Sequence, residues 1–441
     1  MAERKAIVIL GASGDLAKRK LVPALNALNQ NKRLDPDTII VGSGRTFFSD
    51  QAFRNRFNAP EGFRELLYYH QGIQGLKQFI EEKGAFSRIV FFCALPPSTY
   101  GQTAQELRAE GFGKEAALII EKPFGYDRAS AQVLNTELTK YFNETQIFRI
   151  DHYLAKEAVQ NILVFRFANP VFTPVWNSEC IESIQINAFE SEGVADRGAY
   201  FDSAGIVRDM IQNHLIQLLC LLTMDVPVSL NAEEIQKKKI SVLKTMQVLS
   251  CNRFQYQGYH DEKGVAPGST TETFAELKLV INNPRWKGVP VYIRAGKAMN
   301  RKGTEIGIRL KPLPNLLFNE KGAVQPNKIV FLIQPMPGIV LDVATKIPGK
   351  HYQIAQTPMK FCYRDSFDSN IPEAYQKLLE DALNNDRTLF VSAKEAEASW
   401  ELFGPVLDAG KVEGYEKFAL PFTRFSFDWI DFERYPGACS K

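Results

Sequence analysis

The sequence has no strong excess of either charge, and this excludes partners that bind through electrostatics alone. Lysine and arginine number 53 and aspartate and glutamate number 50, which leaves a formal net charge of +3. The charges are spread along the chain without long basic blocks. We therefore expect neither nucleic acid nor an anionic membrane as a partner, whereas a small anionic ligand needs only a few local cations.

The sequence also lacks paired cysteines and long apolar runs. Its six cysteines form no Cys-x-x-Cys pair, which disfavours a zinc site or a disulfide framework and favours a reducing compartment. The longest apolar run, residues 215–222, contains Gln217 and is far too short to cross a bilayer. The first residues show no cleavable signal pattern. These absences predict a soluble cytoplasmic protein without a metal site.

What is present is ordinary for a globular protein, because apolar residues make up 45% and charged residues 23% of the 441 positions. A chain of this length exceeds one ordinary core and predicts two domains. The pattern of expected elements changes near residue 150. We therefore expect a first domain over residues 1–150 and a second over residues 151–441.

The first domain alternates short apolar strands with helical segments. Residues 6–10 form a continuous apolar run, which is typical of a strand buried on both faces, and residues 16–28 follow with helical spacing. This order predicts a Rossmann-like, doubly wound parallel sheet. Further strands are expected at residues 38–41, 89–94, 117–120 and 146–150.

The second domain is richer in alternating strands and has few intervening helices. This pattern predicts a larger α+β domain built on a mainly antiparallel sheet, with one face solvated or covered by helices. Strands are expected around Ile186, Leu279 and Ile308 and at residues 328–334 and 339–345, and helices at residues 205–224, 373–383 and 393–407.

A glycine-rich turn follows the first strand and opens the first helix. Residues 11–17 read Gly-Ala-Ser-Gly-Asp-Leu-Ala, a G-x-x-G-x-x-A variant of the dinucleotide fingerprint. Gly11 permits the tight turn, Gly14 allows close approach of the backbone, and Ala17 permits close packing of the helix, whose N-terminus offers N–H groups to a pyrophosphate. The turn predicts a dinucleotide site formed by both glycines with Ser13, Asp15 and Leu16.

The residue after the second strand predicts which dinucleotide is bound. NAD-specific sites usually place an acidic residue there. This strand is instead followed by Gly42-Ser-Gly-Arg45-Thr46, without an acid, and Arg45 can hold a phosphate through two hydrogen bonds. We predict NADP⁺ as the cofactor; the alternative is that Arg45 is a solvated loop residue.

Residues 149–161 hold an unusual number of ionisable and aromatic groups. His152 and Lys156 are four apart, so a helix beginning at this point would place both on one face. With Tyr153 they form a candidate clamp for a terminal phosphate. The alternative is a salt-bridged helix N-terminus capped by Asp151. The spacing alone does not separate the two interpretations.

Two further segments carry candidate residues. Lys122 and Pro123 follow a parallel strand, at the edge where open α/β sheets bind ligands, and the bond between them could be cis or trans. Asp209 and His214 lie in an otherwise apolar helix, where a lone histidine is more often a structural core residue. They are five residues apart, about 140° around an α-helix, so helical spacing does not pair them.

Taken together, these segments resemble the glucose-6-phosphate dehydrogenase family. Ala155 departs from the glycine usual in the family, and the chain is shorter at about 50–90 and 225–270. The shared patterns, in family order, are GASGDLAKRKL (11–21), EKPFG (121–125), RIDHYLAKE (149–157), RGAYFDSAGIVRDMIQNH (197–214), RWKGVPVYIRAGK (285–297) and LIQP (332–335).

The resemblance implies oxidation of glucose 6-phosphate at C1 to the lactone with reduction of NADP⁺, the first step of the oxidative pentose phosphate pathway. It assigns the general base to His214, oriented by Asp151. It implies a phosphate site of His152, Tyr153 and Lys156, with Lys20 and Lys297 reaching in. It assigns the sugar hydroxyls to Glu190, Asp209 and Lys122, with Gln334 nearby, and the nicotinamide to Lys122 and Pro123.

Two other functions compete with this one. A sugar oxidoreductase of the glucose–fructose type is similar in architecture and has a Glu-Lys-Pro turn, but the phosphate clamp favours a phosphorylated sugar. A non-catalytic NADP(H)-binding regulator would typically have lost the base or the clamp, and both are present here. The family resemblance, and a large sheet with one uncovered face, also predict a homodimer or a dimer of dimers.

Overall fold

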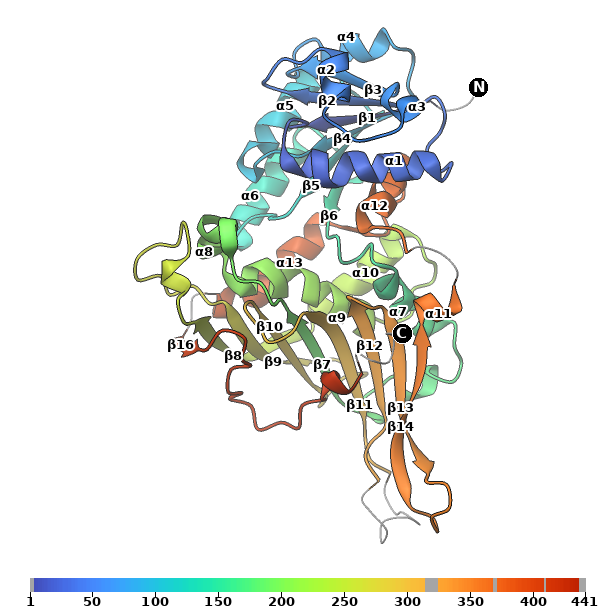
Figure 1. Cartoon of the computed structure of the whole chain (residues 1–441), viewed down its shortest axis with the longest axis vertical. Coiled ribbons are helices and arrows are strands. Elements are labelled where there is room, and N and C mark those ends of the chain that lie inside the picture. The colour runs from blue at the N-terminus through green and yellow to red at the C-terminus, as the bar shows by residue number, and fades with distance from the viewer. Residues whose placement is uncertain (1–3, 314–323, 368–370, 408–409, 436–441) are drawn as a thin grey trace. The chain divides into compact units, whose positions relative to one another are not determined.

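A computed structural model describes residues 4–313, 324–367, 371–407 and 410–435 (Figure 1). The chain divides into two compact units, each built on one sheet. The first unit comprises Met1–Lys156, Pro227–Lys237 and Pro372–Trp400, and the second comprises Glu157–Val226, Lys238–Ile371 and Glu401–Lys441. Two segments from later in the sequence therefore complete the first unit.

The sheet of the first unit has the strand order β15-β6-β5-β4-β1-β2-β3. Neighbouring strands are parallel except for β15, which runs antiparallel to β6. The strand order reverses between β1 and β4, and sheets of this kind bind ligands at the carboxyl ends of the strands at that point. The strands are β1 (Lys5–Leu10), β2 (Ile39–Gly44), β3 (Leu67–Gln71), β4 (Arg88–Cys93), β5 (Ala116–Glu121), β6 (Ile147–Ile150) and β15 (Phe390–Val391).

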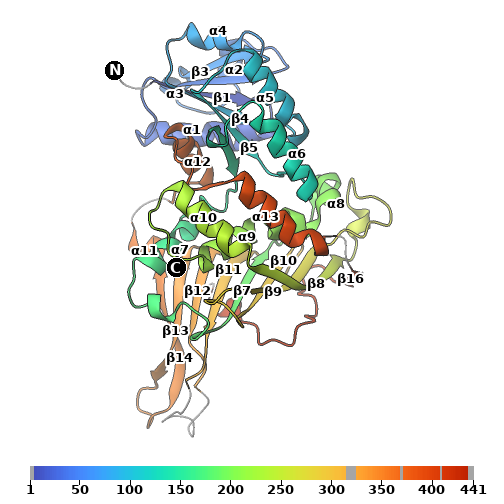
Figure 2. The same cartoon turned by 180° about the vertical axis from the view of Figure 1, so that it is seen from behind.

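Helices cover both faces of this sheet (Figures 1 and 2). Helices α1 and α12 pack together on one face, and α5 and α6 pack together on the other. Because both faces are covered, each residue from Ala6 to Leu10 in β1 is at most 2% exposed, which explains the continuous apolar run. The helices are η1 (Ala17–Leu21), α1 (Val22–Gln30), α2 (Asp50–Arg54), α3 (Glu61–Arg64), α4 (Leu76–Glu81), α5 (Tyr100–Ala109), α6 (Arg128–Thr139) and α12 (Ala374–Leu383).

The sheet of the second unit has the order β14-β13-β12-β11-β7-β10-β9-β8-β16. Neighbours are antiparallel except for β7 with β10 and β8 with β16. The carboxyl ends of β7, β10 and β12 consequently share one edge. The strands are β7 (Ile181–Phe189), β8 (Met246–Tyr256), β9 (Phe274–Ile281), β10 (Pro290–Gly296), β11 (Gly303–Leu310), β12 (Lys328–Gln334), β13 (Gly338–Lys346), β14 (Ile354–Cys362) and β16 (Val412–Tyr415).

Helices pack on one face of this second sheet, and the chain's own C-terminal segment crosses the other (Figures 1 and 2). Helix η6 packs on β7 and β10, and α7 packs on β12 and α9. On the opposite face, Gln185 of β7 accepts a hydrogen bond from Ile430 N at 3.0 Å, and Phe427 stacks on Tyr292 at 4.0 Å. The helices are α7 (Glu157–Phe167), α8 (Gly198–Ile206), η6 (Val207–Leu215), α9 (Ile216–Thr223) and α11 (Tyr363–Ser366), with α10 (Ala232–Leu243) and α13 (Ala393–Phe403) drawing residues from both units.

The predicted fold class is confirmed in both units. Strand β12 has the bounds predicted for it, and α12 and α13 lie within the predicted ranges 373–383 and 393–407. The predicted helix over 205–224 corresponds to η6 followed by α9. Strands β3, β8, β10, β14, β15 and β16 are additions that the sequence pattern did not predict.

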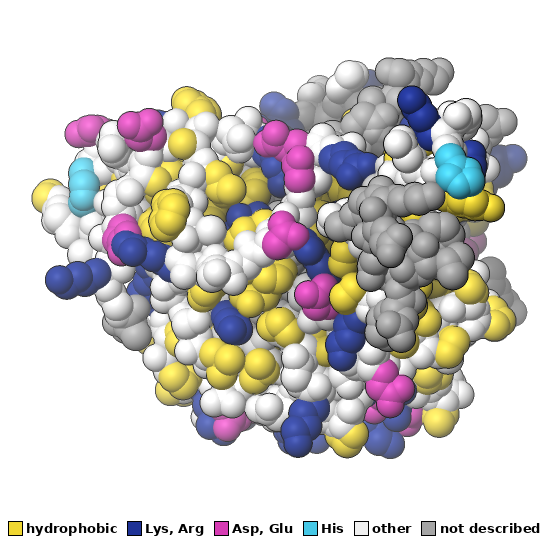
Figure 3. All heavy atoms as spheres, turned by 90° about the horizontal axis from the view of Figure 1, so that it is seen from below, with side chains coloured by type: hydrophobic (Ala, Val, Ile, Leu, Met, Phe, Trp, Pro, Cys, Tyr) yellow, Lys and Arg dark blue, Asp and Glu magenta, His cyan; other side chains and the backbone are white. Residues whose placement is uncertain are grey.

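Composition and cysteine pairing can also be compared with the structure. Among the described helices, none is both long enough and apolar enough to cross a membrane. On the face seen in Figure 3, basic and acidic side chains lie among apolar ones.

Cys93, Cys180, Cys220 and Cys251 are free thiols, whereas Cys362 forms a disulfide bond. The expectation that disulfides are disfavoured fails at Cys362, because spacing along the chain does not report which cysteines meet on folding.

Candidate active site

The glycine turn lies at the carboxyl end of β1, between β2 and β4. The N–H groups of Gly11 and Ala12 both donate hydrogen bonds to Ser43 O, at 2.8 and 3.0 Å. Gly11 has φ +86°, and a Cβ there would lie 2.4 Å from Ala94 O, so only glycine fits. The following helix begins at Asp15, so its N-terminus lies at the turn, as a pyrophosphate site requires.

Arg45 follows β2 at the same edge of the sheet, and its side chain is exposed. Its carbonyl oxygen accepts a hydrogen bond from the Gln71 side chain at 2.8 Å, which holds the loop backbone. Within the described part of the chain, no carboxylate forms an ion pair with the Arg45 guanidinium. This cation is therefore available to an anionic ligand.

The carboxyl end of β5 carries Glu121, followed by Lys122 and Pro123, whose peptide bond is cis. Glu121 Oε1 accepts a hydrogen bond from the Tyr375 hydroxyl at 2.8 Å, and Glu121 O accepts one from the Tyr100 hydroxyl at 3.1 Å. Burial raises the pKa of Glu121 to about 7, although the hydrogen bond from Tyr375 and the charge of Lys122 act in the opposite direction. A half-buried acid thus stands directly before the predicted ligand-binding residues.

Residues 151–156 follow β6 and form turns, and α7 begins only after them. The prediction that His152 and Lys156 share a helical face is therefore wrong. The reason is local: the Asp151 carboxylate accepts a hydrogen bond from Tyr153 N at 3.0 Å, two residues on. Such a bond offers the backbone an alternative to the helix.

The turns nevertheless bring a cation and two aromatic rings together. Lys156 Nζ lies 4.4 Å from the centre of the Tyr153 ring, and the His152 and Tyr153 rings are 5.2 Å apart. Burial lowers the pKa of Lys156 to about 8, while the charge of Asp151 acts against this effect. The candidate phosphate clamp is thus a compact cluster even though it is not helical.

The residues predicted to bind ligand in the first unit share one edge of its sheet. Strands β1, β2, β5 and β6 run parallel, so the segments that follow their carboxyl ends lie along this edge. Lys20, on η1, extends the group and pairs with Glu373 at 3.2 Å. Glu373 directly precedes α12, so the late segment 372–400 supplies both Glu373 and Tyr375.

A second group of predicted residues lies at the carboxyl edge of the second sheet. Glu190 follows β7 and Lys297 follows β10, and these strands are parallel neighbours. The Lys297 ammonium group contacts the Glu190 carboxylate and lies 3.9 Å from Asp209 Oδ2. Lys297 and Asp209 are only 6% and 5% exposed, so water screens their interaction weakly. These three residues form a charged cluster in which Lys297 and Asp209 are buried and Glu190 is partly exposed.

Tyr200 belongs to this cluster, although the sequence did not single it out. Its hydroxyl donates a hydrogen bond to Asp209, and burial together with the charge of Asp209 raises the pKa of Tyr200 to about 12. Tyr200 lies within the family pattern over 197–214, but nothing in its spacing reveals its partner.

Gln334 ends β12, two strands from β7 on the same edge of the second sheet, and precedes a cis proline.

Asp209 and His214 lie on η6, which is wound as a π-helix. Backbone bonds in such a helix join residues five apart and each turn holds more residues than in an α-helix, so these two positions lie closer together around the axis than α-helical winding would place them. The expectation of about 140° between them assumed α-helical winding and is wrong. His214 is 1% exposed, so this helix presents its imidazole inside the protein.

The start of η6 is fixed by Gly205 and Glu272. Gly205 has φ +68° and ψ 170°, and a Cβ there would lie 2.4 Å from Glu272 Oε1. The same carboxylate oxygen accepts a hydrogen bond from Val207 N at 3.1 Å. Burial raises the pKa of Glu272, and the hydrogen bond from Val207 opposes this. Gly205 therefore lets the chain turn from α8 into the helix that carries Asp209 and His214.

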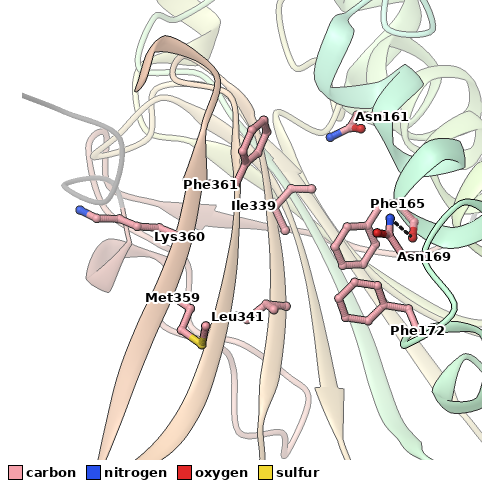
Figure 4. A pocket seen from close by; sticks show the side chains of 9 residues that line it. All are labelled: Asn161, Phe165, Asn169, Phe172, Ile339, Leu341, Met359, Lys360 and Phe361. Atoms are coloured by element: carbon pink, nitrogen blue, oxygen red, sulfur yellow. Dashed lines mark hydrogen bonds between the residues drawn. The ribbon is translucent and has the colours of Figure 1, made fainter. Parts of the chain in front are cut away.

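The second unit also contains a separate pocket of about 470 Å³, between α7 with its following turn and strands β13 and β14 (Figure 4). Phe165 and Phe172 stack at 4.0 Å on the helical side and face Ile339 and Leu341 on the strands. The lining contains neither histidine nor carboxylate, so this pocket does not supply a base for proton transfer.

The doubly wound sheet, its glycine turn and the charged cluster of the second unit define a dinucleotide-binding oxidoreductase. Residues 8–161 match the family model described as glucose-6-phosphate dehydrogenase, NAD binding domain. Residues 163–422 match the model described as glucose-6-phosphate dehydrogenase, C-terminal domain. The chain belongs to the glucose-6-phosphate dehydrogenase family, and its dinucleotide-binding domain takes a nicotinamide cofactor.

Relatives match nearly the whole chain. The glucose-6-phosphate 1-dehydrogenase of Aggregatibacter actinomycetemcomitans is 37% identical over 94% of this chain and 93% of its own length. That of Bacillus subtilis is 39% identical over 90% of each. A solved glucose-6-phosphate dehydrogenase in complex with its substrate glucose-6-phosphate is 35% identical, covers 96% of both chains and has a TM-score of 0.90. Gal80p of Saccharomyces cerevisiae, at 11% identity and a TM-score of 0.55, shares the fold alone.

Proposed function

We propose that this chain oxidises D-glucose 6-phosphate at C1 to 6-phospho-D-glucono-1,5-lactone and reduces NADP⁺ to NADPH, the first step of the oxidative pentose phosphate pathway. The observation that carries this proposal is the solved relative in complex with glucose 6-phosphate, which matches 96% of the chain at a TM-score of 0.90. The test is the absorbance of reduced nicotinamide after glucose 6-phosphate is added to the protein and NADP⁺. No reduction with either NADP⁺ or NAD⁺ would contradict the proposal.

NADP⁺ is the proposed cofactor because of the cation that follows β2. Arg45 is exposed, and no carboxylate of the described residues pairs with it. Its guanidinium would bind the 2′-phosphate through charge-assisted hydrogen bonds, while the turn at Gly11 and Gly14, with Ser13, Asp15 and Leu16, would hold the pyrophosphate. Arg45→Ala should cost about 1.5–3 kcal/mol of NADP⁺ binding. Unchanged relative affinity for NADP⁺ and NAD⁺ would remove Arg45 from the site.

His214 is the proposed general base. Oxidation at C1 requires that the C1 hydroxyl proton be removed as hydride leaves C1, and the bound nicotinamide accepts that hydride. The neutral imidazole of His214 takes the proton. Asp151 accepts a hydrogen bond from the other ring nitrogen, which fixes the tautomer and stabilises the imidazolium. The place of His214 in the family pattern, on a buried π-helix, supports this role.

The sugar phosphate is held at both ends in this proposal. The cluster of His152, Tyr153 and Lys156 binds the 6-phosphate. Lys20 and Lys297 already pair with carboxylates, so their contribution requires an exchange of those partners for phosphate. The proposed hydroxyl-binding residues are Glu190, Asp209 and Lys122, with Gln334 nearby, and Lys122 and Pro123 border the nicotinamide.

The two parts of the chain take different tasks in this proposal. Residues 1–150 form the NADP-binding domain, and residues 151–441 form the substrate and dimerisation domain. The protein works in the cytoplasm as a homodimer or a dimer of dimers, which its family membership and balanced charge support. Light scattering on the purified protein tests the assembly, and a monomer at assay concentration would contradict it. Cell fractionation tests the compartment.

Two alternative functions would give assay results that differ from those of the proposed function. Activity with free glucose but not with glucose 6-phosphate would favour a sugar oxidoreductase of the glucose–fructose type. Stoichiometric binding of NADP⁺ without formation of NADPH on addition of glucose 6-phosphate would favour a non-catalytic regulator. The cluster around Lys156 supports the dehydrogenase over the first, and the presence of both His214 and Asp151 supports it over the second.

A further inference from the structure

Arg56, which follows α2, reaches back across the edge of the first sheet to two segments of the nucleotide site. Its Nη2 donates a hydrogen bond to Ser13 O in the glycine turn at 3.0 Å. Its guanidinium carbon lies 4.8 Å from the centre of the Phe48 ring, in the loop that continues from Arg45. The Arg56 side chain thus connects the pyrophosphate-binding turn to the loop after β2. In doubly wound folds the adenosine ribose lies between these two segments.

The position of this guanidinium is fixed by the packing around it. Phe48 contacts Tyr69 edge-on, with ring centres 5.1 Å apart, and the Tyr69 hydroxyl donates a hydrogen bond to Thr46 O. Burial raises the pKa of Tyr69, and the charge of Arg56 acts against this, as expected of a cation close to the phenol. The loop that carries Arg45 is therefore braced by the residues that hold Arg56.

Helix α2 is itself anchored to the sheet. Asp50 Oδ1 accepts a hydrogen bond from Tyr69 N on β3 at 2.7 Å. The Phe53 ring packs so closely on Gly42 that a Cβ at position 42 would lie 2.2 Å from it. The rings of Phe53 and Phe57, which flank Arg56 in sequence, also meet edge-on with their centres 5.1 Å apart. This packing limits the freedom of the Arg56 backbone, so its side chain is preorganised.

The charge of Arg56 is not neutralised by the protein. Over the ranges that the structure describes, no carboxylate pairs with it, and its buried Nε makes no hydrogen bond. Its neighbour Arg54 differs, because Arg54 Nε donates to Leu67 O at 2.8 Å and so supports the backbone. Arg19, on the helix after the turn, differs too, because it pairs with Asp15 at 2.7 Å. Arg56 is therefore a half-buried cation that keeps N–H donors available for a ligand, and it lies beside the predicted pyrophosphate site.

We propose that Arg56 is a second cation of the adenosine 2′-phosphate site and, with Arg45, determines preference for NADP⁺ over NAD⁺. This inference rests on the proposed function, which already assigns NADP⁺. A 2′-phosphate carries close to two negative charges, and two guanidinium groups from different segments can bind its oxygens together. Arg45 lies on the exposed loop, whereas Arg56 is held by Ser13 O and Phe48 and supplies the fixed side of the site.

The test compares two fragments of the cofactor that differ only in the phosphate at issue. Binding of adenosine 2′,5′-bisphosphate and of adenosine 5′-monophosphate to the full-length protein is measured by calorimetry. Arg56→Gln should weaken the bisphosphate by about 10- to 100-fold and the monophosphate by less than about threefold, on the scale of lost charge-assisted hydrogen bonds. Arg56→Lys should recover part of the loss, because it keeps the charge without the planar donors.

The controls separate the different ways in which the inference could fail. Lys114→Gln removes one exposed positive charge just before β5, at the opposite edge of the same sheet, and should change neither affinity. Equal weakening of both fragments in Arg56→Gln would mean that Arg56 only supports the glycine turn, and this would overturn the inference. A wild-type protein that binds both fragments equally would instead contradict the proposed NADP⁺ preference itself.

Discussion

The hydroxyl of Tyr375 on α12 donates a hydrogen bond to Glu121 at the end of β5, over 2.8 Å and across 254 positions of sequence. Burial raises the pKa of Glu121 from 4.5 to about 7. A carboxyl group whose pKa is higher in the folded protein binds its proton more tightly there. Ionising it therefore costs folding free energy. The cost is absent below pH 4.5, grows as the pH rises to 7, and is fully present above that.

We expect Glu121→Gln to gain stability relative to the wild type as the pH rises. The amide cannot ionise, yet its oxygen can still accept the hydrogen bond from Tyr375. The difference in free energy of unfolding should shift by on the order of 3 kcal/mol between pH 4.5 and pH 8 in favour of the variant. Urea denaturation of both proteins at each pH measures this, and a constant difference would disprove a raised pKa.

Tyr375→Phe is the companion variant for the same pair. It removes the donor and leaves the half-buried Glu121 carboxylate with one hydrogen bond fewer. The loss should be about 1–3 kcal/mol of unfolding free energy, and larger at pH 8, where the acid is ionised, than at pH 5. Equal losses at the two pH values would mean that the hydroxyl serves the protonated acid equally well.

His214→Asn should impair the chemical step selectively. The smaller amide fits into the space of the imidazole but cannot accept and hold the substrate proton. Turnover should fall by roughly 10²–10⁴-fold while binding of glucose 6-phosphate, followed by calorimetry, is retained. If turnover barely falls, the base is another residue.

Lys156 predicts a specific pH dependence of substrate affinity. Its pKa of about 8 means that the ammonium form is present below pH 8 and is lost as the pH rises above it. The sugar phosphate stays dianionic over this range, so KM for glucose 6-phosphate should rise by up to about tenfold from pH 8 to pH 9. Lys156→Arg keeps its charge and should flatten this rise. A similar rise in Lys156→Arg would assign the titration to another group.

Gly205→Ala should disturb the helix that carries Asp209 and His214. At φ +68° and ψ 170° a side chain is strained, and the new Cβ would lie 2.4 Å from Glu272 Oε1. We expect a loss of about 1–3 kcal/mol in unfolding free energy together with reduced turnover. Gly404→Ala is the matched control, because a Cβ there meets nothing within 4 Å. A Gly205→Ala protein as stable as this control would rule out the strained turn.

The local sequence pattern was sufficient to predict a strand where the strand's own residues are apolar and buried. Strand β12 was predicted with its observed bounds because its central residues are apolar and buried. Strand β10 was not predicted, although it alternates apolar positions with Tyr292 and Arg294. These polar positions are covered late in the chain: the Arg294 guanidinium lies 3.6 Å from the centre of the Trp429 ring. No pattern within β10 reports that partner.

The candidate residues could be found from the sequence because their types and family patterns are distinctive. Their geometry could not be predicted in the same way. The turn over 151–156 depends on one hydrogen bond from Tyr153 N to Asp151. The wide winding of η6 has no sequence signal, so the angle between Asp209 and His214 could not be derived. Arg56 belongs to no family pattern and is revealed only by its contact with Ser13.

The return of residues 372–400 to the first unit bears on how the protein is made. Strand β15 extends the parallel sheet beside β6, and α12 packs Leu378 and Leu379 into the same core as Leu25 and Leu28 of α1. A ribosome has therefore synthesised most of the chain before the nucleotide-binding unit can close. A fragment ending near Lys156 would emerge with an open sheet edge and an uncovered apolar helix face, which are features that chaperones and aggregation both recognise.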